Sequence, residues 1–133
     1  MQGIIDKLAL IYIVGGRILS TRSKGKDTYY LPGGKREGAE TDQETLIREI
    51  KEELTVDILP ETIEFVGQFE AQAHGKAEGM IVQMRCYSAQ FSGELQAASE
   101  IEEVVWLSYT DRARTSPVDQ IIFDYLKEKG LLV

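Results

Sequence analysis

Short apolar runs and alternating apolar positions predict five β-strands along the chain. The first two are joined by Gly15-Gly16, which indicates a hairpin, and the third and fourth flank a polar turn at residues 74–79. Alternate residues of the third and fourth strands are apolar, so each has one face directed to a core. The expected strands are Leu8–Val14, Arg17–Arg22, Thr62–Ala73, Met80–Phe91 and Ile101–Leu107.

Two further segments have helical periodicity. The first begins at Thr41, where Thr41 and Glu44 are spaced as a capping box, and it is expected to end near Leu54. The second is opened by Pro117 and followed by Gly130. The apolar stripes are Leu46, Ile47, Ile50 and Leu54 in the first helix, and Val118, Ile121, Ile122, Tyr125 and Leu126 in the second.

Strands and helices in this order predict an α/β fold in which helices cover both faces of a sheet. A chain of 133 residues is long enough for one domain that buries roughly two-thirds of its unfolded surface. We therefore expect residues 1–133 to form a single domain. Cys86 is the only cysteine, which excludes an internal disulfide, and it is expected to be a small buried residue.

Three glutamates lie on one flank of the first predicted helix. At about 100° per residue, Glu49, Glu52 and Glu53 fall within an arc of roughly 100° beside the apolar stripe. Like charges at these spacings repel one another, and Arg48 can relieve part of the repulsion by pairing with Glu52. The cluster is either a solvated acidic helix face or a Mg²⁺ or Mn²⁺ site, since hard cations take carboxylate oxygens.

The loop before this helix favours the metal site. Pro32-Gly33-Gly34 is a strong turn signal, and glycines there let a backbone approach a ligand closely. Glu40 is placed to pair with Arg48 and so to tie the loop to the helix. An ordinary turn between a strand and a helix would account for the loop alone.

The spacing of these residues resembles the signature box of the Nudix hydrolases. The matching residues are Gly34, Glu40, Arg48, Glu49, Glu52 and Glu53, within the 23 residues Gly34–Val56. The preceding segment, Tyr30 to Lys35, is also similar to the family's usual approach to the box. One position departs from the family pattern, because Thr55 stands where a glycine usually ends the helix in a left-handed conformation. A β-branched residue is an outlier at positive φ, so we predict that Thr55 keeps a negative φ.

The resemblance implies the Nudix fold, an α/β/α sandwich around a mixed sheet. It also implies Mg²⁺- or Mn²⁺-dependent hydrolysis of a nucleoside diphosphate linked to a further moiety X, with water attacking phosphorus. A bound metal supplies the positioning and charge neutralisation that such a transfer needs. The resemblance makes Glu49, Glu52 and Glu53 metal ligands and catalytic residues, with Arg48 holding them in place. One of these glutamates, or a more distant acid, would act as the base.

Substrate-binding residues are expected in the loop and in the strands before it. Gly33 and Gly34 would let the backbone lie against the substrate. Arg22 and Lys35 match basic positions that face phosphates in similar proteins, and a surface role is the alternative for each.

A further metal ligand or base is expected outside the box. Glu100, Glu102 and Glu103 precede Val104-Val105-Trp106 in the last expected strand, and a solvated surface acid is the alternative for each. We favour Glu100, because a loop residue can swing inward.

Other polar and aromatic residues have less certain places in the site. Gln83, Arg85 and Tyr87 share a polar sheet face, which is either solvated or part of a nucleobase pocket. Trp106 is expected in the core, and His74 on the surface at a hairpin tip.

The net charge of −7 argues against a nucleic-acid polymer or an anionic membrane as the main partner. Between Gly15 and Arg36, however, six basic residues stand against Asp27 alone, a net charge of +5 that suits a small anionic substrate. The run Leu8–Val14 is too short to span a membrane and lacks the layout of a signal peptide. We expect a cytoplasmic enzyme whose oligomeric state, a homodimer included, is open.

The identity of X is open as well. The stretch Glu70–His74 lacks the proline and tyrosine markers of ADP-ribose hydrolases and diadenosine polyphosphate hydrolases. The short chain and the LPGGK approach resemble the MutT-like nucleoside triphosphate pyrophosphatases, which implies hydrolysis of a (d)NTP to the (d)NMP and pyrophosphate. ADP-ribose, sugar nucleotides and other diphosphates stay open as substrates. So do a non-catalytic nucleotide-binding module, against which the intact glutamates count, and an acidic interaction helix without a ligand.

Overall fold

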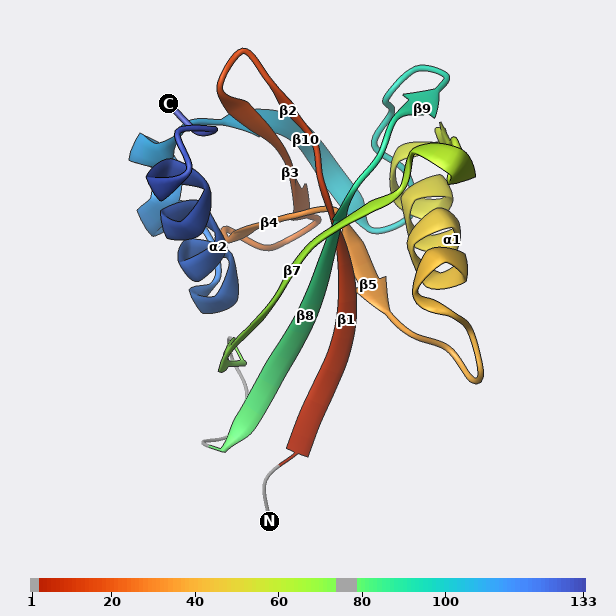
Figure 1. Cartoon of the computed structure of the whole chain (residues 1–133), viewed down its shortest axis with the longest axis horizontal. Coiled ribbons are helices and arrows are strands. Elements are labelled where there is room, and N and C mark those ends of the chain that lie inside the picture. Colours follow the sequence, from red (N-terminus) through yellow and green to blue (C-terminus); the bar gives the residue numbers. More distant parts are fainter. Residues whose placement is uncertain (1–2, 74–78) are drawn as a thin grey trace.

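The computed structural model describes residues 3–73 and 79–133 of the chain. One four-stranded sheet has the order β5-β1-β8-β7 (Figure 1). Its strands are Gly33–Lys35 (β5), Gly3–Ile11 (β1), Met80–Ser88 (β8) and Glu64–Gln72 (β7). β1 and β8 run parallel and the other pairs are antiparallel. The sheet is therefore mixed, as expected.

A second sheet has the order β10-β3-β2, with β4 paired to β3. Its strands are Ile101–Leu107 (β10), Arg17–Ser23 (β3), Ile13–Val14 (β2) and Tyr29–Tyr30 (β4). β2 and β3 form the hairpin predicted at Gly15-Gly16. A separate two-stranded ribbon pairs Asp57–Ile58 (β6) with Phe91–Ser92 (β9).

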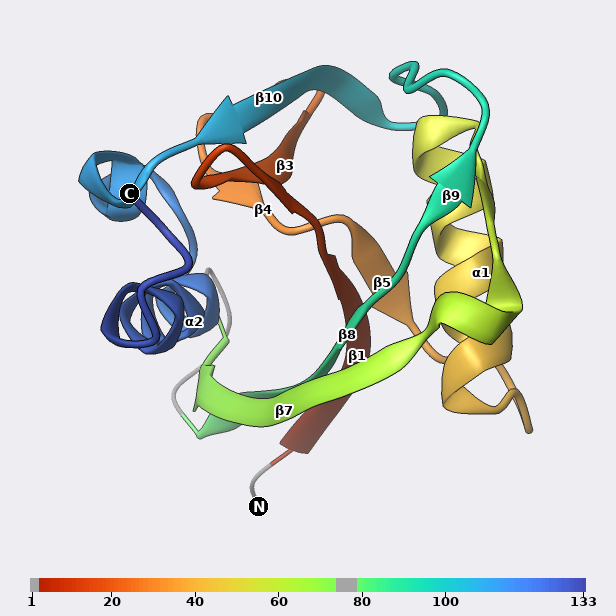
Figure 2. The same cartoon turned by 45° about the horizontal axis from the view of Figure 1, so that its top comes forward.

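The apolar run predicted as one strand, Leu8–Val14, divides at Tyr12. Residues up to Ile11 pair with β5 and β8, whereas Ile13 and Val14 pair with β3. The run therefore carries the chain from one sheet into the other. Figure 2 shows β3 and β10 turned away from the long strands β1, β7 and β8.

Two helices, Asp42–Leu54 (α1) and Pro117–Glu128 (α2), lie on opposite sides of the first sheet (Figures 1 and 2). Alternation along β1 supplies apolar side chains to both sides. Leu8 and Leu10 belong to the buried cluster under α1, and Ala9 and Ile11 belong to the cluster under α2. The α/β/α arrangement expected from the sequence is confirmed. Two 3₁₀ turns, Pro60–Thr62 and Tyr109–Arg114, complete the regular elements.

The ends of α1 confirm one prediction and contradict another. Thr41 and Glu44 form both bonds of the expected capping box. Thr55, however, has φ 65° and ψ 10°, so the prediction of a negative φ is wrong. The Thr55 N–H donates to the Lys51 carbonyl, and its hydroxyl donates to the Glu94 carbonyl over 3.2 Å. These bonds hold the threonine in the left-handed conformation that a glycine usually adopts at this position.

The core of the α2 side differs in detail from the predicted stripe. Ile121 is 42% exposed, whereas Phe123 and Asp119 are fully buried, so the buried face is turned toward these two residues. Trp106 is 38% exposed, and its expected place in the core is wrong. Cys86 is buried, as predicted.

Candidate active site

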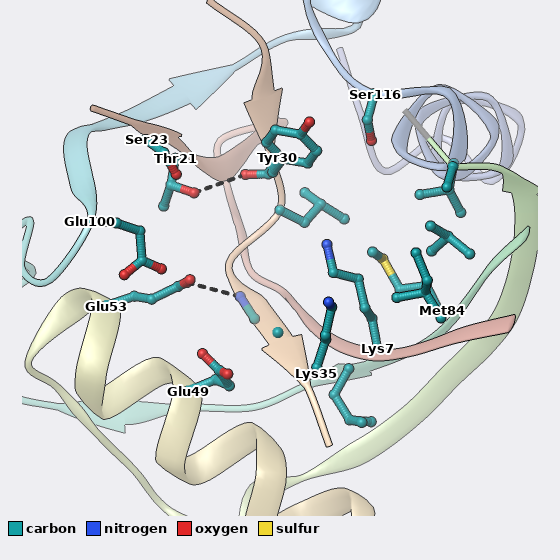
Figure 3. Close-up of a pocket in the computed structure, with 18 of the residues that line it drawn as sticks. Lys7, Thr21, Ser23, Tyr30, Lys35, Glu49, Glu53, Met84, Glu100 and Ser116 are labelled. Atoms are coloured by element: carbon teal, nitrogen blue, oxygen red, sulfur yellow. Dashed lines mark hydrogen bonds between the residues drawn. The ribbon is translucent and has the colours of Figure 1, made fainter. Parts of the chain in front are cut away.

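A cavity of about 520 Å³ lies between α1, the two sheets and the segment that opens α2. Four glutamates line it: Glu49 and Glu53 from α1, Glu100 from the residue before β10, and Glu37 from the loop after β5. Lys7 of β1 and Lys35 of β5 line the wall that Figure 3 shows across from Glu49, Glu53 and Glu100. The cavity thus holds charges of both signs, with two lysines across from three of its glutamates.

Glu53 is the most deeply buried of the acids, with 7% of its surface exposed. Its Oε1 accepts a hydrogen bond from the Gly33 N–H over 3.0 Å. Burial above all, with the charges of Glu49 and Glu100, raises the pKa of Glu53 to about 8, against the effects of the Gly33 bond and of Lys7. At neutral pH the Glu53 carboxyl is therefore largely protonated unless a cation lies beside it.

Two glycines of β5 make room for these acids. A Cβ on Gly34 would lie 2.4 Å from the Glu49 carboxylate. Gly33 has φ 145°, and a Cβ there would lie 2.0 Å from the Leu8 carbonyl oxygen. Gly33 therefore excludes a side chain, whereas a side chain at Gly34 would displace the Glu49 carboxylate. Both glycines line the cavity.

Arg48 ties the loop before α1 to the helix. Its Nε lies 2.7 Å from Glu40 Oε2, and its NH2 group donates to Glu40 Oε1 and to the Lys35 carbonyl, each over 3.0 Å. The Arg48 bond lowers the pKa of Glu40 to about 2. NH1 of Arg48 also reaches Glu49 at 3.3 Å and Glu52 at 3.2 Å. The pairs predicted from the sequence are present, and they fix β5 against α1.

Glu52 lies apart from the other two box glutamates. Its side chain is 53% exposed, and it is absent from the lining of the cavity. Glu49 is more buried, and burial raises its pKa despite the nearby Arg48. The structure thus brings Glu49 and Glu53 together and leaves Glu52 on the outer flank of the helix.

The three acids before and within β10 have different surroundings. Glu100 lines the cavity, and hydrogen bonds from Ser99 and from the backbone lower its pKa, with a smaller contribution from Glu53. Glu102 is exposed. Glu103 accepts from Arg22 Nε over 3.0 Å and from the Tyr29 hydroxyl over 2.9 Å. Glu100 is the one of the three that the fold places in the cavity.

Arg22 does not line the cavity, and its expected contact with substrate is not supported by its position. Residues alternate along β3, so Thr21 and Ser23 point into the cavity and Arg22 points away. Its guanidinium is held by Glu103 and by the Lys26 carbonyl.

The polar face of β8 also lies outside the cavity. Arg85 and Tyr87 both bond to Asp42 at the start of α1, and Gln83 donates to Glu70. None of the three β8 side chains lines the cavity, so their position does not support a nucleobase pocket there. His74 lies outside the described residues.

The donor set suits a hard divalent cation. In residues 3–73 and 79–133, no three or more His, Cys, Asp or Glu are already arranged to hold a metal ion. Yet Glu53, Glu100 and Glu49 all line this cavity, and Glu53 contributes to the lowered pKa of Glu100. A cation bound there would replace the proton and relieve the repulsion that raises the pKa of Glu53.

Two charged residues near the cavity, Lys7 and Asp119, were not predicted from the sequence as site residues. Lys7 lies on the face of β1 that otherwise carries Ile5, Ala9 and Ile11, and one charge on an apolar face was a usable signal. Asp119 of α2 is fully buried and accepts from the Leu31 N–H over 3.0 Å. It follows Val118 in the expected stripe, and nothing in the periodicity distinguishes it from a solvated acid.

A family model described as the NUDIX domain matches residues 7–126. The chain belongs to the Nudix family. Among similar solved structures, the ORF135 protein of E. coli is 26% identical, with 95% of this chain and 92% of that chain covered and a TM-score of 0.73. The MutT protein of Methanosarcina mazei Go1 is 17% identical, with 97% and 96% covered and a TM-score of 0.76.

A MutT Nudix hydrolase of Burkholderia pseudomallei is also similar, at 24% identity, with 82% of this chain and 86% of that chain covered and a TM-score of 0.67. A comparison with curated proteins found no match. This Nudix protein is a pyrophosphohydrolase, of a family that generally uses divalent cations and acts on small-molecule nucleotides. None of the helices in the described part of the chain is long and apolar enough to cross a membrane.

Proposed function

We propose that this Nudix hydrolase converts a (d)NTP to the (d)NMP and pyrophosphate with Mg²⁺ or Mn²⁺. The observation that carries the proposal is the cavity in which Glu49, Glu53 and Glu100 lie across from Lys7 and Lys35. One wall suits a divalent cation and the other suits phosphoryl oxygens. We further propose that one domain, residues 1–133, contains the whole site.

Glu49 and Glu53 would hold the metal from α1, and Glu100 would be a further ligand or the proton acceptor. The family resemblance makes Glu52 a metal ligand as well. To bind the metal, its side chain would have to break its ion pair with Arg48. The bound metal would neutralise phosphoryl charge and activate water. The water oxygen attacks phosphorus, the bond to the leaving pyrophosphate breaks, and a carboxylate takes the proton of the water.

Arg48 would act through position and not through contact with substrate. Its bonds to Glu40 and to the Lys35 carbonyl hold β5, and hence Gly33 and Gly34, against the glutamates of α1. Since Gly33 N–H donates to Glu53, the same strand orients a proposed metal ligand. ADP-ribose, sugar nucleotides and other diphosphates are the alternative substrates. A cytoplasmic location and a homodimer stay predictions.

A hydrolysis screen tests the proposal. Standard and oxidised (d)NTPs, ADP-ribose, sugar nucleotides and dinucleoside polyphosphates are incubated with the protein and Mg²⁺, with EDTA as the blank. We expect (d)NMP and pyrophosphate from at least one triphosphate, and loss of most turnover in Glu52→Gln and Glu53→Gln variants that still fold. Preferred turnover of a sugar nucleotide would replace the substrate assignment, and no turnover of any compound would favour a binding module.

A further inference from the structure

Lys7 and Lys35 lie directly opposite each other on neighbouring antiparallel strands. The register of β1 and β5 pairs their Cα atoms, so both side chains leave the same face. Figure 3 shows the Lys7 and Lys35 side chains extending side by side along the wall of the cavity. Like charges directly opposite one another destabilise a sheet. The fold alone therefore does not favour this pair of lysines.

Neither ammonium group has a carboxylate partner among the described residues. The Lys7 Nζ lies 5.6 Å from the centre of the Tyr30 ring, a weak contact with the face of an aromatic side chain. Lys7 also occupies the face of β1 that otherwise packs apolar side chains. Two unpaired charges thus converge on the cavity at some cost to packing.

The charge of Lys7 acts on the two buried acids of this region, Glu53 and Asp119. Burial raises the pKa values of Glu53 and of Asp119, and the charge of Lys7 acts in the opposite direction on both. A purely structural role for Lys7 would be to neutralise these two acids from a distance. That role predicts a less stable protein when the charge is removed.

We propose that Lys7 and Lys35 together bind phosphoryl oxygens of the substrate. These are oxygens that a metal at Glu49, Glu53 and Glu100 does not bind. An ammonium group is a compact donor that suits phosphate as a point charge. In its nucleotide form the inference rests on the proposed function, but the two-lysine subsite itself needs only a phosphoryl anion. It makes Lys7 a specificity-determining residue that favours a triphosphate over a diphosphate joined to a neutral sugar.

The test measures equilibrium binding of inorganic tripolyphosphate by calorimetry, in EDTA so that no metal contributes. Lys7→Met removes the charge and keeps a side chain of similar length, and we expect about 10- to 100-fold weaker binding, as for the loss of one charge-assisted hydrogen bond. Lys129→Met is the matched control, because Lys129 is an exposed residue just after α2. It should bind within about twofold of the wild type, a difference within the expected effect of a distant surface charge.

Thermal unfolding without ligand separates binding from structure. Lys7→Met should melt no lower than the wild type, since it removes the repulsion with Lys35, and Lys7→Arg should restore most of the binding. A lower melting temperature in Lys7→Met with unchanged tripolyphosphate binding would overturn the proposal in favour of the structural role. No binding by the wild type would overturn it as well.

The kinetic arm compares a triphosphate with a sugar diphosphate. We expect kcat/KM of Lys7→Met to fall about 10- to 100-fold for the triphosphate and little for the sugar diphosphate. Equal losses would refute the role in specificity. If neither compound is turned over, the proposed function fails, while the tripolyphosphate result still decides whether the subsite exists.

Discussion

Glu53 and Asp119 are two buried acids that hold the same short segment from opposite sides. Glu53 of α1 accepts from the Gly33 N–H, and Asp119 of α2 accepts from the Leu31 N–H, each over 3.0 Å. Burial raises the pKa of both, to about 8 and about 6. Yet Glu53 lines the cavity beside two other carboxyl groups, whereas Asp119 is fully buried and does not line it. The difference shows that a buried acid becomes a candidate catalyst only where a ligand can reach it.

Replacing each acid by its neutral amide should give the largest difference between Glu53 and Asp119, measured as kcat. Glu53→Gln should lower kcat by about 10²- to 10⁴-fold, because it removes a proposed metal ligand next to the reacting phosphorus. Asp119→Asn keeps an acceptor for the Leu31 N–H and should retain turnover within about tenfold, with no loss of a metal-binding group. Both are measured with the best substrate of the screen, and folding is checked by circular dichroism. Equal losses in the two variants would show that lining the cavity does not distinguish Glu53 from Asp119 in catalysis.

Asp119 and Glu53 should each make the free energy of unfolding depend on pH, over different pH ranges. An acid whose pKa is higher in the folded state favours folding when protonated, so stability falls as pH rises through its folded pKa. For Asp119 the loss extends from about pH 4 to 6, and for Glu53 from about pH 4.5 to 8. The losses should be on the order of 3 kcal/mol for Asp119 and 5 kcal/mol for Glu53.

Urea unfolding between pH 4 and 8.5, without metal, measures these losses. Glu53→Gln should remove the decline above pH 6, and Asp119→Asn should remove mainly the decline below it. A wild-type stability that rises from pH 5 to 8 would contradict the assigned pKa shifts.

Magnesium should stabilise the protein through one acid and not the other. At a concentration 100 times Kd, a ligand that binds only the folded state adds about 2.7 kcal/mol. We expect this gain in the wild type and in Asp119→Asn, growing with pH because the metal competes with the proton on Glu53. Glu53→Gln should show a much smaller gain in a thermal-shift titration, and an unchanged gain would place the cation elsewhere.

The end of α1 offers the smallest effect and a control away from the cavity. Thr55→Val loses the hydroxyl bond to Glu94 and keeps the strained φ, whereas Thr55→Gly loses the bond and relieves the strain. We expect Thr55→Gly to be more stable than Thr55→Val by about 1–2 kcal/mol, the cost of a left-handed β-branched residue. Neither should change kcat, and a valine variant as stable as the glycine variant would show that the conformation is unstrained.

Local sequence determined α1 and the residues that hold it. The capping box, the apolar stripe and the Arg48–Glu40 pair were predictable because each depends on residues within one helix and its preceding loop. β7 and β8 of the large sheet were predictable for the same reason, since alternation is a local property. β5 lies where a turn was expected, and β1 begins at Gly3, before the expected Leu8. The angle at Thr55 was not predictable, because a contact with Glu94, far along the chain, fixes it.

Tertiary structure decided which charged residues share the cavity. Glu100 and Lys7 line the cavity and Arg22 does not. The register of β1 with β5 and of β10 with β3 decides this. Register is set by pairing between distant segments, and a shift of one residue would move each side chain to the other face of its sheet. The sequence by itself therefore determined the acidic helix and its family, while only the fold could set two lysines across from its glutamates.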